Sequence, residues 1–222
     1  MPTSHPYQID DILQLILETG PHSLLDIGVG FGKYGVLARE YLELWNGYKH
    51  YKDWNHRIDG IEVFSSYMTP LHDFIYNQIY IGNALEVLPK MEIRYDLILL
   101  IDVLEHFEKE EGFRILELSE QKARNLIIST PLDIEEQADS FNNPHERHQF
   151  QWRKSHLKIL KNAFFISNRK SILCYSGEDA LRVKKRFLRR KRSTLYRETL
   201  PRLAATLERL KKFKRSIFPK PK

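Results

Sequence analysis

The sequence that decides the fold is the stretch LLDIGVGFGKYG, residues 24–35. The residues at its start form a short apolar run that predicts a buried strand over Ser23–Ile27. Three glycines at alternate positions follow, and they allow a tight turn in which the backbone approaches a ligand closely. A helix predicted over residues 33–45 comes next, with its first unpaired N–H groups beside the turn. The stretch therefore predicts a strand–turn–helix unit that holds a nucleotide-like ligand.

Strands and helices alternate along most of the chain. The further predicted strands are 58–63, 78–81, 96–102 and 125–129, and the predicted helices are 9–17, 66–77, 84–91 and 109–121. Such an alternation is typical of βαβ units around a parallel sheet. Two last apolar runs, at 163–167 and 171–175, are separated by three polar residues and predict an antiparallel hairpin.

Acidic residues beside the glycines limit which kinds of ligand can bind there. Gly30, Gly32 and Gly35 match the dinucleotide pattern G-x-G-x-x-G, so an NAD-dependent oxidoreductase remains an alternative. Asp26 counts against it, because a carboxylate just before the glycines would repel a pyrophosphate. Glu62 also counts against it, since it ends the second strand thirty residues after Gly32 rather than about 20. A carboxylate at that place can accept hydrogen bonds from both ribose hydroxyls.

The chain resembles the class I methyltransferases that use S-adenosylmethionine (SAM), in particular the small-molecule type. The resemblance covers residues 23–175 and rests on four motifs in order: DIGVGFG at 26–32, GIEVF at 60–64, GNA at 82–84 and YDLILLIDVLEH at 95–106. It implies a Rossmann-like α/β fold, a sheet of seven mostly parallel strands whose last strand is antiparallel, flanked by helices. It also implies SAM as the cofactor and methyl transfer as the activity.

The same resemblance assigns the cofactor-binding residues. Asp26 and the glycines would line the methionine part of SAM, and Asp102 would lie near its amino group. Glu62 would hold the ribose, with Val63 packed on the adenine, and Asn83 would replace the more usual Asp beside the adenine amino group. The implied set is Asp26, Gly28, Gly30, Gly32, Glu62, Val63, Asn83, Ala84 and Asp102.

The acceptor side of the site is less constrained. A general base helps methyl transfer only if the acceptor oxygen or nitrogen must lose a proton. His106 is the first candidate for that base and His145 the second, since both follow strands at the carboxyl edge of the sheet. The cluster His145, Glu146 and His148 raises the question of a metal. Its spacing, with no further clustered ligand in the sequence, favours the absence of a metal site.

An aromatic stretch between the second helix and the second strand leaves two interpretations open. It contains Trp45, Tyr48, His50, Tyr51 and Trp54. It either forms part of an acceptor pocket or packs its aromatic rings on one another. The predicted acceptor is a small molecule or a lipid- or glycan-linked group.

Charge divides the chain into two parts. Residues 181–222 hold 17 of the 35 Lys and Arg residues and two acids, which gives this segment a net charge of +15. Because the whole chain has a net charge of +6, the rest of the chain has a net charge of −9. We expect a methyltransferase domain over 1–178 and a basic extension over 179–222 with an amphipathic helix. Three roles are open for the extension: docking on the body or on a second copy as a homodimer, attachment to an anionic membrane surface, and, ranked last, nucleic-acid binding.

Composition also bounds the location. One cysteine, Cys174, excludes a disulfide within the chain. The first residues do not have the build of a signal peptide, and no apolar run reaches the length of a membrane span. A cytoplasmic protein is expected, peripheral to the membrane if the extension binds lipid. A non-catalytic SAM-binding module tethered by its basic tail is the alternative function.

Overall fold

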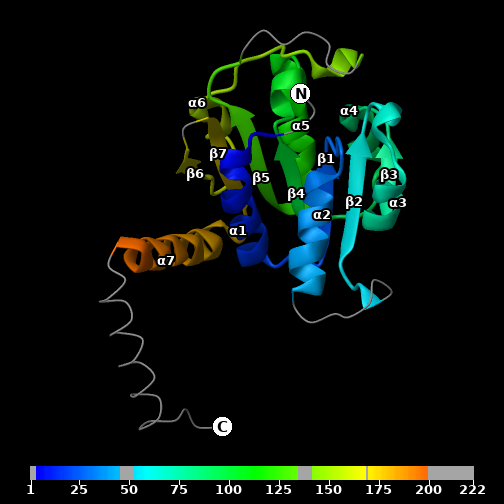
Figure 1. Cartoon of the computed structure of the whole chain (residues 1–222). Helices are drawn as coiled ribbons and strands as arrows, with labels where there is room; N and C mark the ends of the chain where they lie inside the picture. The colour runs from blue at the N-terminus through cyan, green and yellow to red at the C-terminus, as the bar shows by residue number, and fades with distance from the viewer. Residues whose placement is uncertain (1–3, 46–52, 135–141, 169, 200–222) are drawn as a thin grey trace. The chain divides into compact units, whose positions relative to one another are not determined.

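One seven-stranded sheet forms the centre of the computed structural model, which describes residues 4–45, 53–134, 142–168 and 170–199 (Figure 1). The strand order is β3-β2-β1-β4-β5-β7-β6, and β7 runs antiparallel to both of its neighbours. The predicted fold is confirmed, and each predicted strand is present to within two residues at either end. The strands are β1 (Ser23–Ile27), β2 (Arg57–Glu62), β3 (Gln78–Ile81), β4 (Tyr95–Ile101), β5 (Ala123–Pro131), β6 (Phe164–Ser167) and β7 (Ser171–Gly177).

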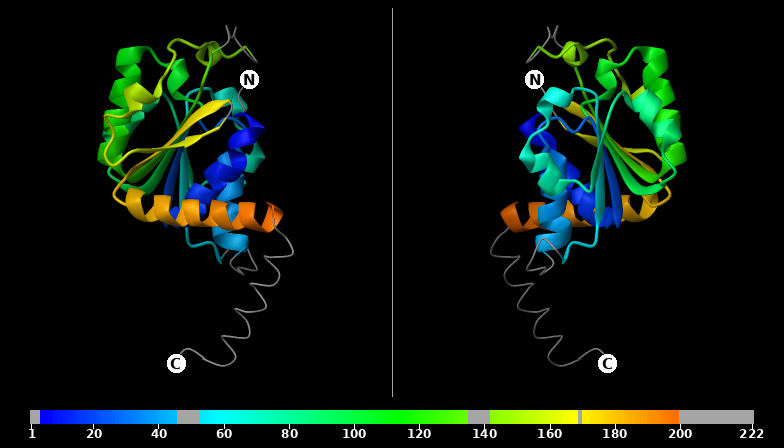
Figure 2. Two further views of the ribbon diagram at one scale, coloured as in Figure 1. Left: turned by 90° about the vertical axis from the view of Figure 1, so that its left-hand side faces the viewer. Right: turned by 90° about the vertical axis from the view of Figure 1, so that its right-hand side faces the viewer.

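Helices cover both faces of the sheet (Figure 2). The first three pack on one face, and the next three lie on the other. Because both faces are covered, the middle of β4 is a continuous apolar run, and Leu97–Leu100 are fully buried. The helices are α1 (Ile9–Thr19), α2 (Lys33–Arg39), α3 (Pro70–Ile75), α4 (Ala84–Val87), α5 (Lys109–Lys122) and α6 (Lys154–Leu157).

A buried tryptophan anchors the segment that follows β5. Trp152 is fully buried, and its indole N–H donates to the carbonyl oxygen of Leu104 at 2.9 Å. Its ring fills a notch at Gly112 of α5, where an added Cβ would lie 2.2 Å from the ring. The segment before Trp152 is thereby fixed next to the end of β4.

Short turns account for most differences from the prediction. The helix expected over residues 33–45 is α-helical only to Arg39 and continues as a π-helical segment, η2 (Glu40–Leu44). Single 3₁₀ turns are too short for the hydrophobic periodicity that identifies helices from sequence. The turns that matter for the site are η1 (Pro6–Gln8), η4 (Ser65–Tyr67), η6 (Leu104–His106) and η7 (Pro144–Glu146).

The carboxyl ends of the parallel strands meet at one edge. Ile27 of β1 is in register with Ile61 of β2 on one side and with Leu100 of β4 on the other. From β1 the sheet is extended on one side by β2 and β3 and on the other side by β4 and β5. The strand order therefore reverses between β1 and β4, and this place is the topological switch point. Ligands bind there in open α/β sheets.

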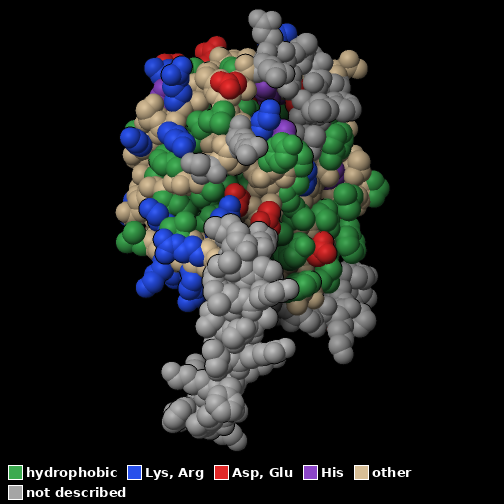
Figure 3. Space-filling view, turned by 60° about the vertical axis from the view of Figure 1, so that its left-hand side comes forward, with side chains coloured by type: hydrophobic (Ala, Val, Ile, Leu, Met, Phe, Trp, Pro, Cys, Tyr) green, Lys and Arg blue, Asp and Glu red, His purple; other side chains and the backbone are tan. Residues whose placement is uncertain are grey.

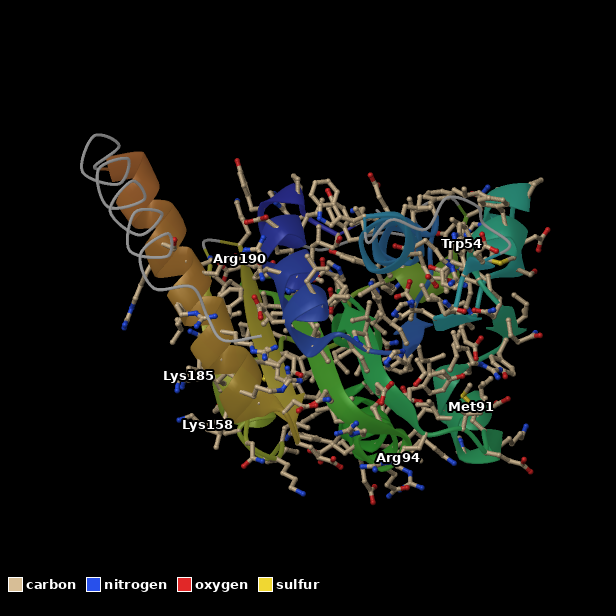
Figure 4. All side chains as sticks on the ribbon, turned by 90° about the horizontal axis from the view of Figure 1, so that it is seen from below. Trp54, Met91, Arg94, Lys158, Lys185 and Arg190 are labelled. Carbon is tan, nitrogen blue, oxygen red and sulfur yellow. The ribbon has the colours of Figure 1, made fainter. Side chains whose placement is uncertain are left out.

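The basic extension begins with a long helix. The chain divides into two compact units, 1–183 and 184–222, and α7 (Ala180–Thr199) crosses that boundary. Lys and Arg side chains gather on α7 (Figure 3), among them Lys185 and Arg190 (Figure 4). Residues 200–222 of the expected amphipathic helix lie outside the described residues. Among the described helices, none has both the length and the apolar character needed to cross a bilayer.

Candidate functional site

The glycine loop after β1 needs its glycines for their backbone conformation. Gly28, Gly30 and Gly32 all have positive φ, at 76°, 54° and 82°, a region that other residues adopt only at a cost. Gly28 N–H donates to the carbonyl oxygen of Ile61 at 2.9 Å, which ties the loop to β2. Gly32 is the N-cap of α2. The loop therefore curves over the end of β1 and leads directly into a helix N-terminus.

Glu62 is the last residue of β2, and its carboxylate faces the loop. One oxygen accepts from Gly30 N–H at 2.8 Å and the other from Phe64 N–H at 2.9 Å. Burial raises the pKa of Glu62, while these backbone hydrogen bonds lower it. A carboxylate offers about four acceptor sites, so these backbone hydrogen bonds leave room for a ligand to donate as well.

Asp26 lies deeper than the glycines that follow it. Its side chain is 2 % exposed and accepts a hydrogen bond from the Tyr76 hydroxyl at 2.7 Å. Burial raises the pKa of Asp26 to about 7, and the Tyr76 hydrogen bond acts against that rise. The carboxylate of Asp26 is thus held against Tyr76, and its contact with a ligand stays a prediction.

Asp102 occupies a strained position just after β4. Its φ is 54°, a left-handed conformation that is uncommon for a residue with a side chain. One carboxylate oxygen accepts from Ser129 Oγ at 2.5 Å and the other from Gln8 Nε2 at 2.8 Å. Burial raises its pKa, and the hydrogen bonds from Ser129 and Gln8 oppose that rise. Strain of this kind gathers at functional sites.

The residues assigned to the adenine side lie at the ends of β2 and β3. Asn83 is the N-cap of α4, where its side-chain oxygen accepts from Leu85 N–H at 2.9 Å. Ala84 is buried and Val63 half-buried. The amide of Asn83 thus already has a structural role in starting α4, and its predicted contact with adenine remains a prediction.

The two histidines proposed as bases differ in their surroundings. His106, on η6, is half-buried, and its Nδ1 lies 3.3 Å from the carbonyl oxygen of Arg147. Burial lowers the pKa of His106 to about 4, so the ring is neutral at pH 7. His145, on η7, is exposed to solvent. The structure therefore places His106 next to the end of β4 and His145 at the surface.

A cluster that the sequence did not indicate joins η4 to η7. The Tyr67 hydroxyl donates to Glu146 at 3.0 Å and accepts from Asn143 Nδ2 at 3.1 Å, and all three residues are buried. Tyr67 also packs against Phe31 of the glycine loop, with ring centroids 5.2 Å apart. Burial raises the pKa of Tyr67 to about 12. The sequence contains one weak signal for Tyr67, its place five residues after Glu62.

Trp54, at the end of the aromatic stretch, lies at the other edge of the sheet. Trp54 stands just before the start of β2 and is labelled in Figure 4. Arg39 lies 4.7 Å above its ring, and Phe74 packs on it edge to face. Residues 46–52 fall outside the described part of the chain. The described end of the stretch thus packs on α2 and α3, far along β2 from Glu62.

The topology separates this fold from that of dinucleotide-binding proteins. A dinucleotide sheet has the strand order 3-2-1-4-5-6, whereas here the antiparallel β7 lies between β5 and β6. The fold is that of the class I SAM-dependent methyltransferases.

Solved structures with the methyltransferase fold are similar over most of this chain. A protein from Nostoc punctiforme PCC 73102, provisionally classed as an O-methyltransferase, is 16% identical with a TM-score of 0.54. The match covers 77% of this chain and 57% of that protein, so this chain spans little more than half of its length. A SAM-dependent methyltransferase from Archaeoglobus fulgidus is 13% identical with a TM-score of 0.54, over 76% of this chain and 94% of the other.

A third methyltransferase-fold structure has been solved with ligands. The N-terminal domain of EvdMO1, crystallised with S-adenosylhomocysteine (SAH) and D-fucose, is 14% identical with a TM-score of 0.54, over 79% of this chain and 84% of that domain. No protein-family model matches the chain. No curated protein matches it either. At these identities the likeness establishes the fold.

Proposed function

We propose that this protein is a SAM-dependent methyltransferase that acts on an oxygen or nitrogen of a small-molecule, lipid-linked or glycan-linked acceptor. The observation that carries the proposal is the carboxylate of Glu62 at the end of β2, hydrogen-bonded to the glycine loop within a methyltransferase fold. Bound SAM supplies a methyl group already activated by its sulfonium, so the protein mainly positions the two reactants.

The residues present suit this cofactor. The acceptor capacity left on Glu62 suits the ribose hydroxyls, and Val63 offers an apolar side chain for the adenine. The positive-φ glycines let the loop approach the methionine part without a side chain in the way. Asp102, held by Ser129 and Gln8, supports a carboxylate near the methionine amino group.

The acceptor would lie beyond the end of β4. His106 is the candidate base in this region because of its place beside the end of β4, although a pKa of about 4 makes its neutral ring a weak base at pH 7. His145 is a weaker candidate, since its side chain is exposed. The D-fucose in the EvdMO1 structure is consistent with a glycan-linked acceptor for this chain.

Calorimetric titration of the full chain with SAM, SAH and NAD tests the proposal. We expect SAM and SAH to bind and NAD not to bind. Glu62→Gln keeps an oxygen for Gly30 N–H but removes the charge, and loss of charged hydrogen bonds worth about 1.5–3 kcal/mol weakens SAH binding roughly 10- to 100-fold. Glu86→Gln, an exposed change on α4, serves as the control. Binding of NAD without SAM, or full SAH affinity in the folded Glu62→Gln variant, would refute the proposal.

A non-catalytic SAM-binding module is the second candidate. It would bind SAM and SAH with the same dependence on Glu62 but transfer no methyl group. Transfer of labelled methyl from SAM to acceptors in a cell extract separates the two.

The basic extension is proposed to attach the protein to an anionic surface. The exposed Lys and Arg side chains on α7 support this, since an amphipathic basic helix binds anionic lipid headgroups. Homodimer formation and nucleic-acid binding are the competing proposals. A cytoplasmic enzyme held at the membrane surface would suit a lipid-linked acceptor.

A further inference from the structure

Three side chains of the metal-binding type converge just beyond β4. Glu105 and His106 belong to the turn η6, and His148 comes from the segment after η7, more than forty residues later. One ligand atom from each lies within 4.8 Å of the others. Glu105 is buried, and both histidines are half-buried. The sequence favoured the absence of a metal site, because too few ligands lie near His148 in the sequence. The fold brings two more, Glu105 and His106, next to it.

Backbone hydrogen bonds hold the two segments together independently of these side chains. The carbonyl oxygen of Glu105 accepts from Gln149 N–H at 2.7 Å and from Phe150 N–H at 3.3 Å. The side chain of Gln149 donates to the carbonyl oxygen of His106 at 2.7 Å. Trp152, in the same segment, donates a hydrogen bond from its indole N–H to the carbonyl oxygen of Leu104. The three ligands are thus brought together by the fold rather than by a metal, which lowers the cost of ordering a site.

The carboxylate of Glu105 requires an explanation of its own. It is 1 % exposed, and its Oε2 has no hydrogen-bond partner in the described part of the chain. A buried carboxyl oxygen without a partner is costly, and buried carboxyl groups are normally hydrogen-bonded or coordinate a metal. The other two members of the cluster are imidazoles, so the cluster offers it no fixed positive charge. A cation between the three groups would satisfy Oε2.

His106 has the orientation of a metal ligand. Its Nδ1 lies 3.3 Å from the carbonyl oxygen of Arg147, so the proton sits on Nδ1 and the lone pair on Nε2. Histidines that bind metals commonly donate their other ring N–H to a backbone carbonyl in this way. The rings of His106 and His148 are 5.2 Å apart, tilted by 42°. Both imidazoles can therefore turn toward a common point.

We propose that Glu105, His106 and His148 bind one divalent first-row transition metal ion. Two imidazoles and one carboxylate suit Zn²⁺, Co²⁺ or Mn²⁺ better than Mg²⁺, which prefers oxygen ligands and retains its waters. Three protein ligands leave a coordination position open. Resting on the proposed methyltransferase function, the inference names the acceptor class: a hydroxyl compound whose oxygen takes the open position beside the methyl donor. His106 then serves as a ligand rather than as the base.

Metal binding to the full chain tests this without any activity measurement. After dialysis against a chelator, titration with Co²⁺ is followed by its visible absorption, and Zn²⁺ is followed by calorimetry. We expect one ion per chain for each metal, and no binding of Mg²⁺ at the same concentration. His148→Ala should weaken Zn²⁺ and Co²⁺ binding at least tenfold, whereas His145→Ala, an exposed imidazole on the neighbouring turn, should leave it within about twofold.

Glu105→Gln provides a second measurement that does not depend on residual affinity. Without metal it should unfold at a higher temperature than the wild type, because the amide avoids the cost of burying an ionisable carboxyl group. With Zn²⁺ it should lose the rise in unfolding temperature that the wild type shows. SAH titration of the same proteins separates this proposal from the proposed function: His148→Ala should bind SAH like the wild type. Absence of Zn²⁺ and Co²⁺ binding in the wild type, or equal binding by His148→Ala, would overturn the metal site whatever the SAH result.

Discussion

The buried carboxylate of Asp26 makes a quantitative prediction about stability. Its pKa is raised from 3.8 to about 7 in the folded protein, chiefly by burial. The folded state therefore holds a proton between about pH 4 and pH 7 that the unfolded state has lost, and stability falls as the pH rises through this window. Three units of pKa correspond to about 4 kcal/mol.

Asp26→Asn removes this titration while keeping an oxygen to accept from the Tyr76 hydroxyl. At pH 4.5, just above the ordinary pKa of an aspartate, the variant should be the more stable by only about 1 kcal/mol. At pH 8 the variant should be more stable, by up to about 4 kcal/mol. Urea unfolding at the two pH values, without cofactor, measures the difference.

The control for Asp26→Asn is Asp73→Asn, an exposed change on α3. Its effect on the free energy of unfolding should be small, because its side chain is exposed. If Asp26→Asn were no more stabilising at pH 8 than at pH 4.5, the burial argument for Asp26 would be wrong.

Two further predictions concern packing and attachment. Trp152→Ala should lower the free energy of unfolding by about 3–5 kcal/mol in urea titrations, because it empties the notch at Gly112; a loss below 1 kcal/mol would contradict the anchoring role. The double variant Lys185→Glu and Arg190→Glu should reduce co-sedimentation with phosphatidylserine vesicles, at roughly 1 kcal/mol per removed cation. Lys158→Glu, exposed on the other unit, is its control, and equal losses in both would refute attachment through α7.

The sheet was predictable because its evidence is local. Each parallel strand is a short apolar run bounded by turn residues, so β1 and β3 have their predicted bounds. The helix after the glycine loop was harder, because a π-helical segment keeps a similar apolar spacing while changing the hydrogen bonds. Arg39 is buried there, with three carbonyl oxygens around its guanidinium, and nothing in the sequence marks a buried arginine.

Some residues of the candidate site could be placed from the sequence, and others could not. The glycines and Glu62 are adjacent to strand ends, so their place at the carboxyl edge follows from the strand pattern alone. The direction of the Asp26 side chain depends on Tyr76, fifty residues away, and the meeting of Glu105 with His148 depends on how Trp152 packs. Contacts of this kind come from tertiary packing, which hydrophobic periodicity does not report.

The link from Gln8 to the end of β4 has a consequence for how the protein forms. Gln8 is fully buried. It donates to Asp102, which lies 94 positions further along the chain, and its Oε1 is 2.7 Å from Oγ of Ser129, 121 positions further along. Contacts so distant in sequence form late, since the loops between them must close first. During synthesis, β1 to β4 emerge before Ser129 is available to hold Asp102 in its left-handed conformation. The methionine end of the site is therefore completed only once β5 has joined the sheet.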